Sequence, residues 1–296
     1  MRLRKTPLRY TAPDMKHNSL PEEPSYPEVR TGQSIAMLKA LHILTRDGRM
    51  NQDSRRKLKQ VYHLYQFIEP LLARVLAMAG SVQVADIGAG KSYLGFILYD
   101  LFLKPREDAS HVYAIEARSE LVRKATTLAA QLSFSRMTFV DLPVAEAMRS
   151  PRLPDKLDVV TALHACDTAT DDAIRFALQK QAPYIVLAPC CQAEVASVLR
   201  QHKAGALADT LAEVWRHPLH TREFGSHLTN VLRCLQLEAS GYQVNVTELV
   251  GWEHSMKNEL IIASFKDLSR ARPARRLHEL LEKFGLLQLQ ERFAAA

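Results

Sequence analysis

The sequence predicts an α/β fold, a Rossmann-like sheet that is mostly parallel, with an antiparallel edge pair, helices on both faces and an N-terminal helical extension. Two observations indicate this fold. From residue 82 onward, short apolar runs typical of strands alternate with segments whose apolar residues recur at helical spacing, the pattern of a parallel sheet covered by helices. The first apolar run also leads into the stretch DIGAG at residues 86–90, a glycine-rich turn of the kind that binds nucleotides in such sheets.

The composition indicates a soluble globular protein. The chain has 296 residues, of which 47% are hydrophobic, and it contains no apolar run of membrane-spanning length. Its basic N-terminus lacks the apolar segment of a secretory signal, and its four cysteines form no recognisable disulfide framework. We therefore expect a cytoplasmic protein with no membrane association.

Four regions follow from the patterning: an extended basic arm over 1–31, a helical segment over 32–80, the main domain over 81–266, and a basic linker with an amphipathic helix over 267–296. Five prolines make the arm unsuitable as a core element. In the helical segment we expect a helix over 34–45 and a longer one over 54–78, capped by Asp53 and kinked at Pro70. The apolar face of the longer helix is expected to be core and comprises Leu58, Val61, Tyr62, Tyr65, Ile68 and Leu72.

The main domain is expected to contain seven strands. The predicted strands are 82–87, 111–116, 137–140, 157–163, 183–188, 243–250 and 259–265, and the predicted helices are 91–103, 119–132, 169–180, 192–215 and 226–240. A short connection joins the last two strands, which suits an antiparallel edge pair. The tail over 274–287 is amphipathic, with Leu277, Leu280, Leu281 and Phe284 on one face.

The turn after the first strand indicates which nucleotide fits. Gly88 and Gly90 flank Ala89 and let the backbone turn sharply and approach a ligand closely. Asp86 ends the strand with a carboxylate, which repels a pyrophosphate but attracts an ammonium group. This favours S-adenosylmethionine (SAM) over NAD or ATP. A structural turn that holds no ligand is the alternative.

The next two strands end in groups that suit the rest of SAM. Glu116 lies at the spacing where an acidic side chain accepts hydrogen bonds from both ribose hydroxyls, although it could instead cap a helix. Asp141 and Leu142 follow the third strand, placed to meet the adenine amino group and its flat face. Three strand ends thus match three parts of one ligand.

Further motifs carry a resemblance to a known family. They are LHACD at 163–167, APCC at 188–191, the basic helix with Lys57 and Gln60, and EHSMKN at 253–258 ahead of LIIA. With these motifs the chain resembles the class I SAM-dependent methyltransferases over roughly residues 54–265, and more narrowly the subgroup with LHxC and a later CC pair, which includes RNA-modifying members. One departure is Ser92, which stands where many members have a third glycine.

The resemblance implies roles for particular residues. Asp86, Gly88, Ala89 and Gly90 would hold the methionine half of the cofactor, Glu116 its ribose, and Asp141 with Leu142 its adenine. His164 and Asp167 would face the transferred methyl group. For transfer to nitrogen or oxygen, a carboxylate or imidazole there removes a proton from the acceptor, but Asp167 could also be only a helix cap.

His164, Cys166, Cys190 and Cys191 should converge, because the fourth and fifth strands are neighbours in a sheet of this order. Three interpretations remain open. In the first, these side chains are packing residues. In the second, one cysteine is a thiolate nucleophile for pyrimidine C5 methylation. In the third, the set binds zinc, although two adjacent cysteines strain a tetrahedral chelate.

Two other polar groups are candidates for substrate contact. His217 and His220 form an HxxH followed by Arg222, which we interpret as a polar substrate-facing loop rather than a metal site, because Pro218 should interrupt any helix. Lys257 and Asn258 lie in the connection of the edge pair, above the same end of the sheet. A solvated turn is the alternative for this pair.

The charge distribution points towards a polyanion. The net charge is +7, and basic residues cluster at 2–9, 49–59 and 266–276. We therefore expect a SAM-dependent methyltransferase that modifies RNA, ribosomal or transfer, at a nitrogen or oxygen, with substrate contacts at Lys57, Arg222, Lys257 and Asn258. The alternatives are C5 methylation through a cysteine, a protein or small-molecule methyltransferase, and an inactive scaffold.

Overall fold

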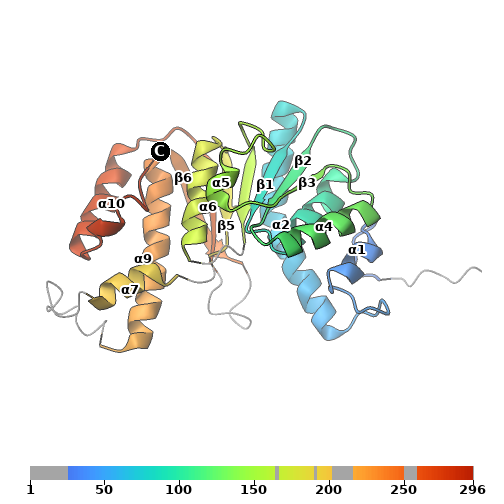
Figure 1. Ribbon diagram of the computed structural model, residues 1–296, viewed down its shortest axis with the longest axis horizontal. Helices are drawn as coiled ribbons and strands as arrows, with labels where there is room; N and C mark the ends of the chain where they lie inside the picture. Colours follow the sequence, from blue (N-terminus) through green and yellow to red (C-terminus); the bar gives the residue numbers. More distant parts are fainter. Residues whose placement is uncertain (1–25, 164–166, 190–191, 202–215, 250–258, 296) are drawn as a thin grey trace, which may run out of the picture.

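The computed structural model describes residues 26–163, 167–189, 192–201, 216–249 and 259–295 (Figure 1). One seven-stranded sheet in the order β3-β2-β1-β4-β5-β7-β6 forms its centre. The strands are β1 (Gln83–Ile87), β2 (His111–Ile115), β3 (Met137–Val140), β4 (Val159–Ala162), β5 (Tyr184–Leu187), β6 (Tyr242–Glu248) and β7 (Glu259–Phe265). Strands β1 to β5 run parallel, and β7 runs antiparallel to both of its neighbours. The predicted sheet and its antiparallel edge pair are confirmed.

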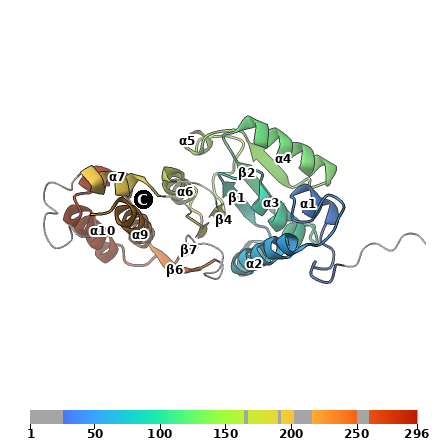
Figure 2. The same cartoon turned by 90° about the horizontal axis from the view of Figure 1, so that it is seen from below.

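Helices cover both faces of this sheet (Figure 2). They are α1 (Ile35–Ala40), α2 (Gln52–Ala79), α3 (Tyr93–Leu98) with a π-helical turn over Tyr99–Leu103, α4 (Ser119–Gln131), α5 (Val144–Ala147), α6 (Thr168–Gln179), α7 (Glu194–Gln201), α9 (Pro218–Ala239) and α10 (Ala271–Lys283). β4 and β5 are buried at every position, which explains their continuous apolar sequence.

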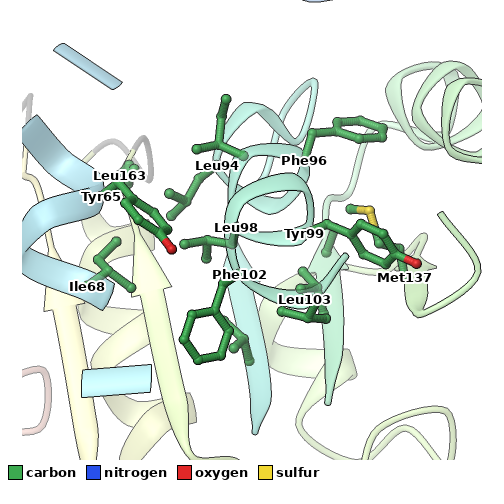
Figure 3. Close-up of a cluster of buried hydrophobic side chains, with 14 of the residues drawn as sticks. Tyr65, Ile68, Leu94, Phe96, Leu98, Tyr99, Phe102, Leu103, Met137 and Leu163 are labelled. Carbon is green, nitrogen blue, oxygen red and sulfur yellow. The ribbon is translucent and has the colours of Figure 1, made fainter. Parts of the chain in front are cut away.

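The larger core lies between the sheet and helices α1 to α4. Tyr65 and Ile68 of α2 face Leu98 and Phe102 of the segment that follows the glycine turn (Figure 3), and all four are almost fully buried. Both the predicted apolar face of α2 and its burial are thus confirmed. The opposite face of the sheet packs against α5, α6 and the end of α9.

A third apolar cluster joins α7, α9 and α10 beside the sheet. Leu277 and Leu281 of α10 are buried there, and Leu280 and Phe284 pack against the cluster. The predicted amphipathic tail is therefore a structural helix. None of the helices that the structure describes is long and apolar enough to span a membrane.

Three local predictions were wrong. Asn51, not Asp53, caps α2, because its side chain accepts a hydrogen bond from the Ser54 N–H at 2.8 Å, while Asp53 lies in the first turn and pairs with Lys57 at 2.8 Å. The first helix ends at Ala40. Helix α9 begins at Pro218 rather than at residue 226; proline suits the first turn of a helix, where its missing N–H would have had no partner.

Hydrogen bonds hold the N-terminal segment against the helix that follows the glycine turn. The Tyr93 hydroxyl, at the start of α3, donates to the Leu41 carbonyl. The Ser34 N–H donates to the buried Asp100 at 2.9 Å, and Lys104 donates to the Gly32 carbonyl at 2.8 Å. These contacts bring the start of α2 to the same edge of the sheet as the turn, the lower edge in Figure 1.

Candidate cofactor site

The ends of β1 and β2 form one hydrogen-bonded unit around the glycine turn. The Ala89 N–H donates to the Ile115 carbonyl at 3.0 Å, and the Gly90 N–H donates to Glu116 Oε2 at 2.8 Å. Gly88 and Gly90 have φ values of 63° and 59°, a region that side chains other than glycine adopt only at a cost. The predicted residues Gly88, Ala89, Gly90 and Glu116 are therefore brought together.

Asp86 is buried beneath this turn, with 3% of its surface exposed. Its Oδ1 accepts a hydrogen bond from the Thr161 hydroxyl at 2.9 Å, across the β1–β4 pair. Burial raises the pKa of Asp86 to about 7, and the Thr161 hydrogen bond only partly offsets this. None of the ion pairs among the described residues involves Asp86. A cationic ligand group beside it would restore its charge, which suits the ammonium of a methionine moiety.

Glu116 is held by Arg118 as well as by the turn. Its Oε1 accepts from the Arg118 N–H at 3.0 Å and from Nε at 2.8 Å, and its Oε2 accepts from Nη2 at 3.2 Å. Burial opposes ionisation, but these bonds outweigh it and lower the pKa of Glu116. The group that the sequence assigned to ribose is thus a preformed, ionised acceptor.

The third strand end lies next to the second. The Glu116 N–H donates to the Val140 carbonyl at 3.1 Å, so β3 delivers Asp141 and Leu142 beside Glu116. Asp141 is exposed and accepts from the Ser119 hydroxyl at 3.1 Å, and Leu142 is half-buried. The three strand ends assigned to methionine, ribose and adenine therefore follow one another along one edge.

Ser92 adopts a left-handed conformation, with φ 56° and ψ 36°. Its side chain is buried, and its hydroxyl has no hydrogen-bond partner among the described residues. It points at Gly95, where an added Cβ would lie only 2.5 Å from the hydroxyl oxygen. The serine that departs from the glycine pattern is thus accommodated by a second glycine one turn on.

Asp167 connects the loops that follow β4 and β5. Its Oδ1 accepts from the N–H groups of Ala193 and Glu194 at 2.9 and 3.3 Å, so it caps the start of α7 and makes no side-chain cap on its own helix. Its backbone has φ 52° and ψ −123°, a conformation that an L-residue adopts only under strain. His164, Cys166, Cys190 and Cys191 lie outside the described residues.

A buried polar network, which sequence reasoning missed, holds this strained residue. Arg233 of α9 has no exposed surface; it donates to both carboxylate oxygens of Asp171 at 2.7 and 2.9 Å and to the Asp167 carbonyl at 2.8 Å. Asn230, three residues before Arg233 in α9, accepts a hydrogen bond from Gln192 at 3.0 Å and donates one to Glu259 at 2.6 Å. An arginine within an amphipathic helix gave no signal that it would be buried.

The two described residues among those predicted to contact substrate lie on different helices. Lys57 pairs with Asp53 and donates to the His42 carbonyl at 3.2 Å. Arg222 lies in the first turns of α9 and pairs with Glu223 at 3.0 Å. Lys257 and Asn258 lie outside the described residues.

The HxxH pair forms no metal site that the structure describes. His217 precedes α9, His220 lies in its first turn, and the two rings make an edge contact at 5.2 Å. Across the described ranges, no group of three or more His, Cys, Asp or Glu residues could hold a metal.

A mostly parallel seven-stranded sheet with one antiparallel strand inserted beside β5 is the fold of the Rossmann-like methyltransferases. Comparison with known families agrees, because residues 56–198 match a family model described as a methyltransferase domain. No curated protein sequence matches the chain.

Several solved methyltransferase structures resemble the chain to different degrees. An O-methyltransferase from Bacillus cereus in complex with SAH has 11% identity and a TM-score of 0.50, over 81% of this chain and 94% of that chain. An SAH-bound methyltransferase from Podospora anserina has 12% identity and a TM-score of 0.45, over 78% and 88%. An rRNA methylase from Streptococcus thermophilus has 11% identity and a TM-score of 0.41, over 67% and 94%.

The matched domain supports a methyl-transferring enzyme, and the cofactor that this fold implies is S-adenosyl-L-methionine. The described residues fit this cofactor: a buried carboxylate that lacks a cation, an ionised acceptor at the second strand end, and a turn whose glycines let the backbone approach a ligand.

Proposed function

We propose that the enzyme methylates RNA, ribosomal or transfer, by direct in-line transfer to a nitrogen or oxygen. The observation that carries the proposal is the basic start of α2, which lies at the cofactor edge of the sheet. Phosphate contacts at this place would hold a polynucleotide next to the reacting methyl group.

The position of this basic cluster follows from its neighbours. Lys57 lies close enough to Tyr93, the first residue of α3, to oppose the rise in the Tyr93 pKa that burial causes. Arg55, Arg56 and Lys59 of the same turns are exposed. Arg55 pairs with Glu28 at 2.8 Å on the surface, and such pairs contribute little stability, so a phosphate can replace the carboxylate.

The cofactor supplies a sulfonium methyl group, a good electrophile that needs only correct positioning of the acceptor. Asp86 would hold its ammonium, Glu116 its ribose hydroxyls and Asp141 its adenine amino group. On the acceptor side, we assign proton removal to His164, because Asp167 Oδ1 already holds the loop after β5. Cys190 and Cys191 would shape the pocket.

The narrower resemblance to the LHxC and CC subgroup supports an RNA substrate, and Lys57, Arg222, Lys257 and Asn258 are its proposed further contacts. The test is to incubate the purified protein with labelled SAM and separate pools of rRNA, tRNA and protein. We expect label in one RNA pool. Label confined to protein or small molecules would contradict the proposal.

Two arginines of one helix provide a matched pair of variants. Arg56→Gln changes a residue at the cofactor edge. Arg74→Gln changes a residue near the other end of α2, and Arg74 is also exposed. Only the first should raise the KM for RNA and flatten its salt dependence.

The chemistry of transfer has its own test. A thiolate that adds to a pyrimidine would leave a stable adduct with 5-fluoropyrimidine RNA. We expect no such adduct, and we expect Cys190→Ser and Cys191→Ser each to retain methyl transfer. An adduct that disappears in one of these variants would establish carbon methylation instead.

A further inference from the structure

A second basic surface lies at the edge of the sheet opposite the cofactor site. The parallel strands begin at this edge, and β7 ends there at Phe265, since it runs antiparallel to β5. Two adjoining hollows share Tyr242 as a common wall. The first is lined by Leu178, Gln181, Ser240, Phe265 and Arg270, and the second extends along the start of α10, past Arg272 and Arg276. We call the two together the basic groove.

The groove carries an excess of positive charge. Among the described residues, the ion pair of Arg270 is with Asp267 and is long, at 3.6 Å, and the Asp267 side chain is 80% exposed. Arg272 and Arg276 are exposed, and no ion pair within the described part of the chain includes either of them. One carboxylate, that of Glu238, also lines the groove. Three arginines and one acidic residue thus line the groove.

Two arginines of the groove lie close enough on α10 to repel each other. Arg272 and Arg276 are four residues apart on α10, so their side chains are neighbours on one helix face. Like charges at this spacing destabilise a helix. An anionic group bound between them would remove this repulsion.

An exposed aromatic ring accompanies the arginines. Phe265 is 42% exposed, although its other side packs edge-on against Tyr242 at 5.3 Å and 71°. Tyr242 is itself fixed, because its hydroxyl donates to the Ala182 carbonyl at 2.7 Å and only 3% of it is exposed. Phe265 is therefore a held ring that keeps a free surface towards solvent.

We propose that the basic groove binds an unpaired segment of the RNA substrate, with Phe265 stacked on a base and Arg270, Arg272 and Arg276 contacting phosphates. Proteins bind single-stranded nucleic acids with this combination, a fixed aromatic surface beside a row of cations. This assignment rests on the proposed function, and it adds a second binding place remote from the reaction.

The separation between the two edges restricts the substrate. The seven residues of β7 span about 20 Å between the cofactor edge and the groove. A nucleic acid that occupies both places must continue well beyond the target nucleotide. Short RNA fragments should accordingly lose affinity even when they contain the target.

The experiment measures binding of a fluorescent single-stranded RNA to the full chain by anisotropy over a range of salt, separately from label transfer. Arg272→Gln with Arg276→Gln should weaken binding and reduce the slope of log K against log salt by roughly 1.4, about 0.7 for each phosphate that an arginine no longer neutralises. Phe265→Leu, which keeps an apolar contact with Tyr242, should weaken binding roughly tenfold with an unchanged slope. The matched control is Arg275→Gln with Lys283→Gln, which removes two charges at exposed positions of α10 that do not line the groove.

The outcomes separate this proposal from the proposed function. Weaker binding in the groove variants, with methyl transfer to RNA by the wild type, supports both. RNA labelling by the wild type together with unchanged binding in the groove variants overturns the groove and leaves the function standing. Binding of an acidic polypeptide in place of RNA, or of no RNA at all, overturns the groove assignment, and label transfer to protein independently overturns the function.

Discussion

Two buried aspartates show how differently this fold treats a carboxylate. Asp171 in α6 is 2% exposed, and Arg233 satisfies both of its oxygens. Asp86 at the end of β1 is 3% exposed, but its partner is the neutral Thr161 hydroxyl, and its pKa rises to about 7. A buried charge is stable only when it is paired. Asp171 is completed by the protein itself, whereas on our proposal a ligand cation completes Asp86.

The same contrast extends to the surroundings of each residue. In the turn that follows β1, the Ser92 hydroxyl is buried without a partner among the described residues, and its backbone is left-handed. Around Asp171, Asn230 and Gln192 continue an unbroken set of hydrogen bonds. The cofactor edge thus contains a strained residue with an unpaired buried hydroxyl, a cost that binding energy can offset.

The largest expected effect comes from breaking the completed pair. Asp171→Asn leaves the Arg233 guanidinium buried and without a counter-charge, which should cost about 3–5 kcal/mol of stability. Urea denaturation measures this loss. The control is Asp172→Asn, the next residue, which is 32% exposed and whose ion pairs lie near the surface; it should cost less than about 1 kcal/mol. Equal losses of stability in the two variants would show that the buried ion pair of Asp171 contributes no more than the surface ion pairs of Asp172.

Neutralising Asp86 should affect cofactor affinity rather than stability. Asp86→Asn removes a buried charge but not a structural ion pair, so stability at pH 8 should stay equal or increase. Affinity for SAM should fall roughly tenfold to a hundredfold, as for the loss of a charged hydrogen bond of about 1.5–3 kcal/mol. Calorimetry measures both, with Asp158→Asn as the control, a half-buried acid at the opposite edge. Unchanged affinity in the folded Asp86 variant would contradict the cofactor assignment.

The raised pKa of Asp86 predicts a pH dependence. The folded state holds its proton up to about pH 7, whereas the unfolded state releases it near 3.8. The contribution of Asp86 to stability is therefore greatest at low pH and declines as the pH rises from about 4 to 7. Binding of the cofactor ammonium needs the ionised form, so affinity should decrease roughly tenfold for each pH unit below 7. Wild type and Asp86→Asn should differ in this slope, and parallel profiles would refute the assignment.

The two aspartates also differ in how far their surroundings could be predicted from the sequence. The sheet, its antiparallel edge pair and the order of the cofactor groups follow from local signals, since each strand is an apolar run and each group sits at its end. Arg233 and Asp171 are 62 residues apart, and an exposed pair in two amphipathic helices would look the same in sequence. Thr161 was missed because only the register of β1 on β4 brings it to Asp86.

Boundaries set by single side chains were harder to predict than the elements themselves. Two neighbouring candidates, Asn51 and Asp53, could each cap α2, and only the geometry distinguishes them. The proline at residue 218 predicts a break, but it begins a helix there. The sequence assigns Asp167 to its own helix or to catalysis, yet its carboxylate contacts the start of another helix 26 residues later.

Ser92 tests whether the strain at the cofactor edge serves binding. Ser92→Gly relieves a left-handed conformation and a buried hydroxyl without a partner among the described residues, while the added freedom of the unfolded chain offsets part of the gain, so stability should increase by about 1 kcal/mol. Thermal unfolding measures the change, and SAM affinity should stay within about twofold if the serine only packs against Gly95. A stabilised variant with much weaker affinity would show that the strain assists binding.

The smallest effect is expected at Arg118, which occupies the acceptor that ribose needs. Its guanidinium donates to both oxygens of Glu116, although 68% of its side chain is exposed. Ribose hydroxyls must donate to the same oxygens, so cofactor binding displaces Arg118 from at least one of them. An exposed ion pair of this kind contributes about 0–1 kcal/mol, and Arg118→Ala should therefore strengthen SAM binding by roughly twofold to fivefold. As a control, Arg123→Ala replaces an exposed arginine in α4, the helix that Arg118 precedes, and should leave the affinity unchanged. Weaker SAM binding by Arg118→Ala would mean that the arginine holds Glu116 in position for the ligand. Glu116 would then resemble Asp171, a carboxylate whose partner is an arginine of the protein itself.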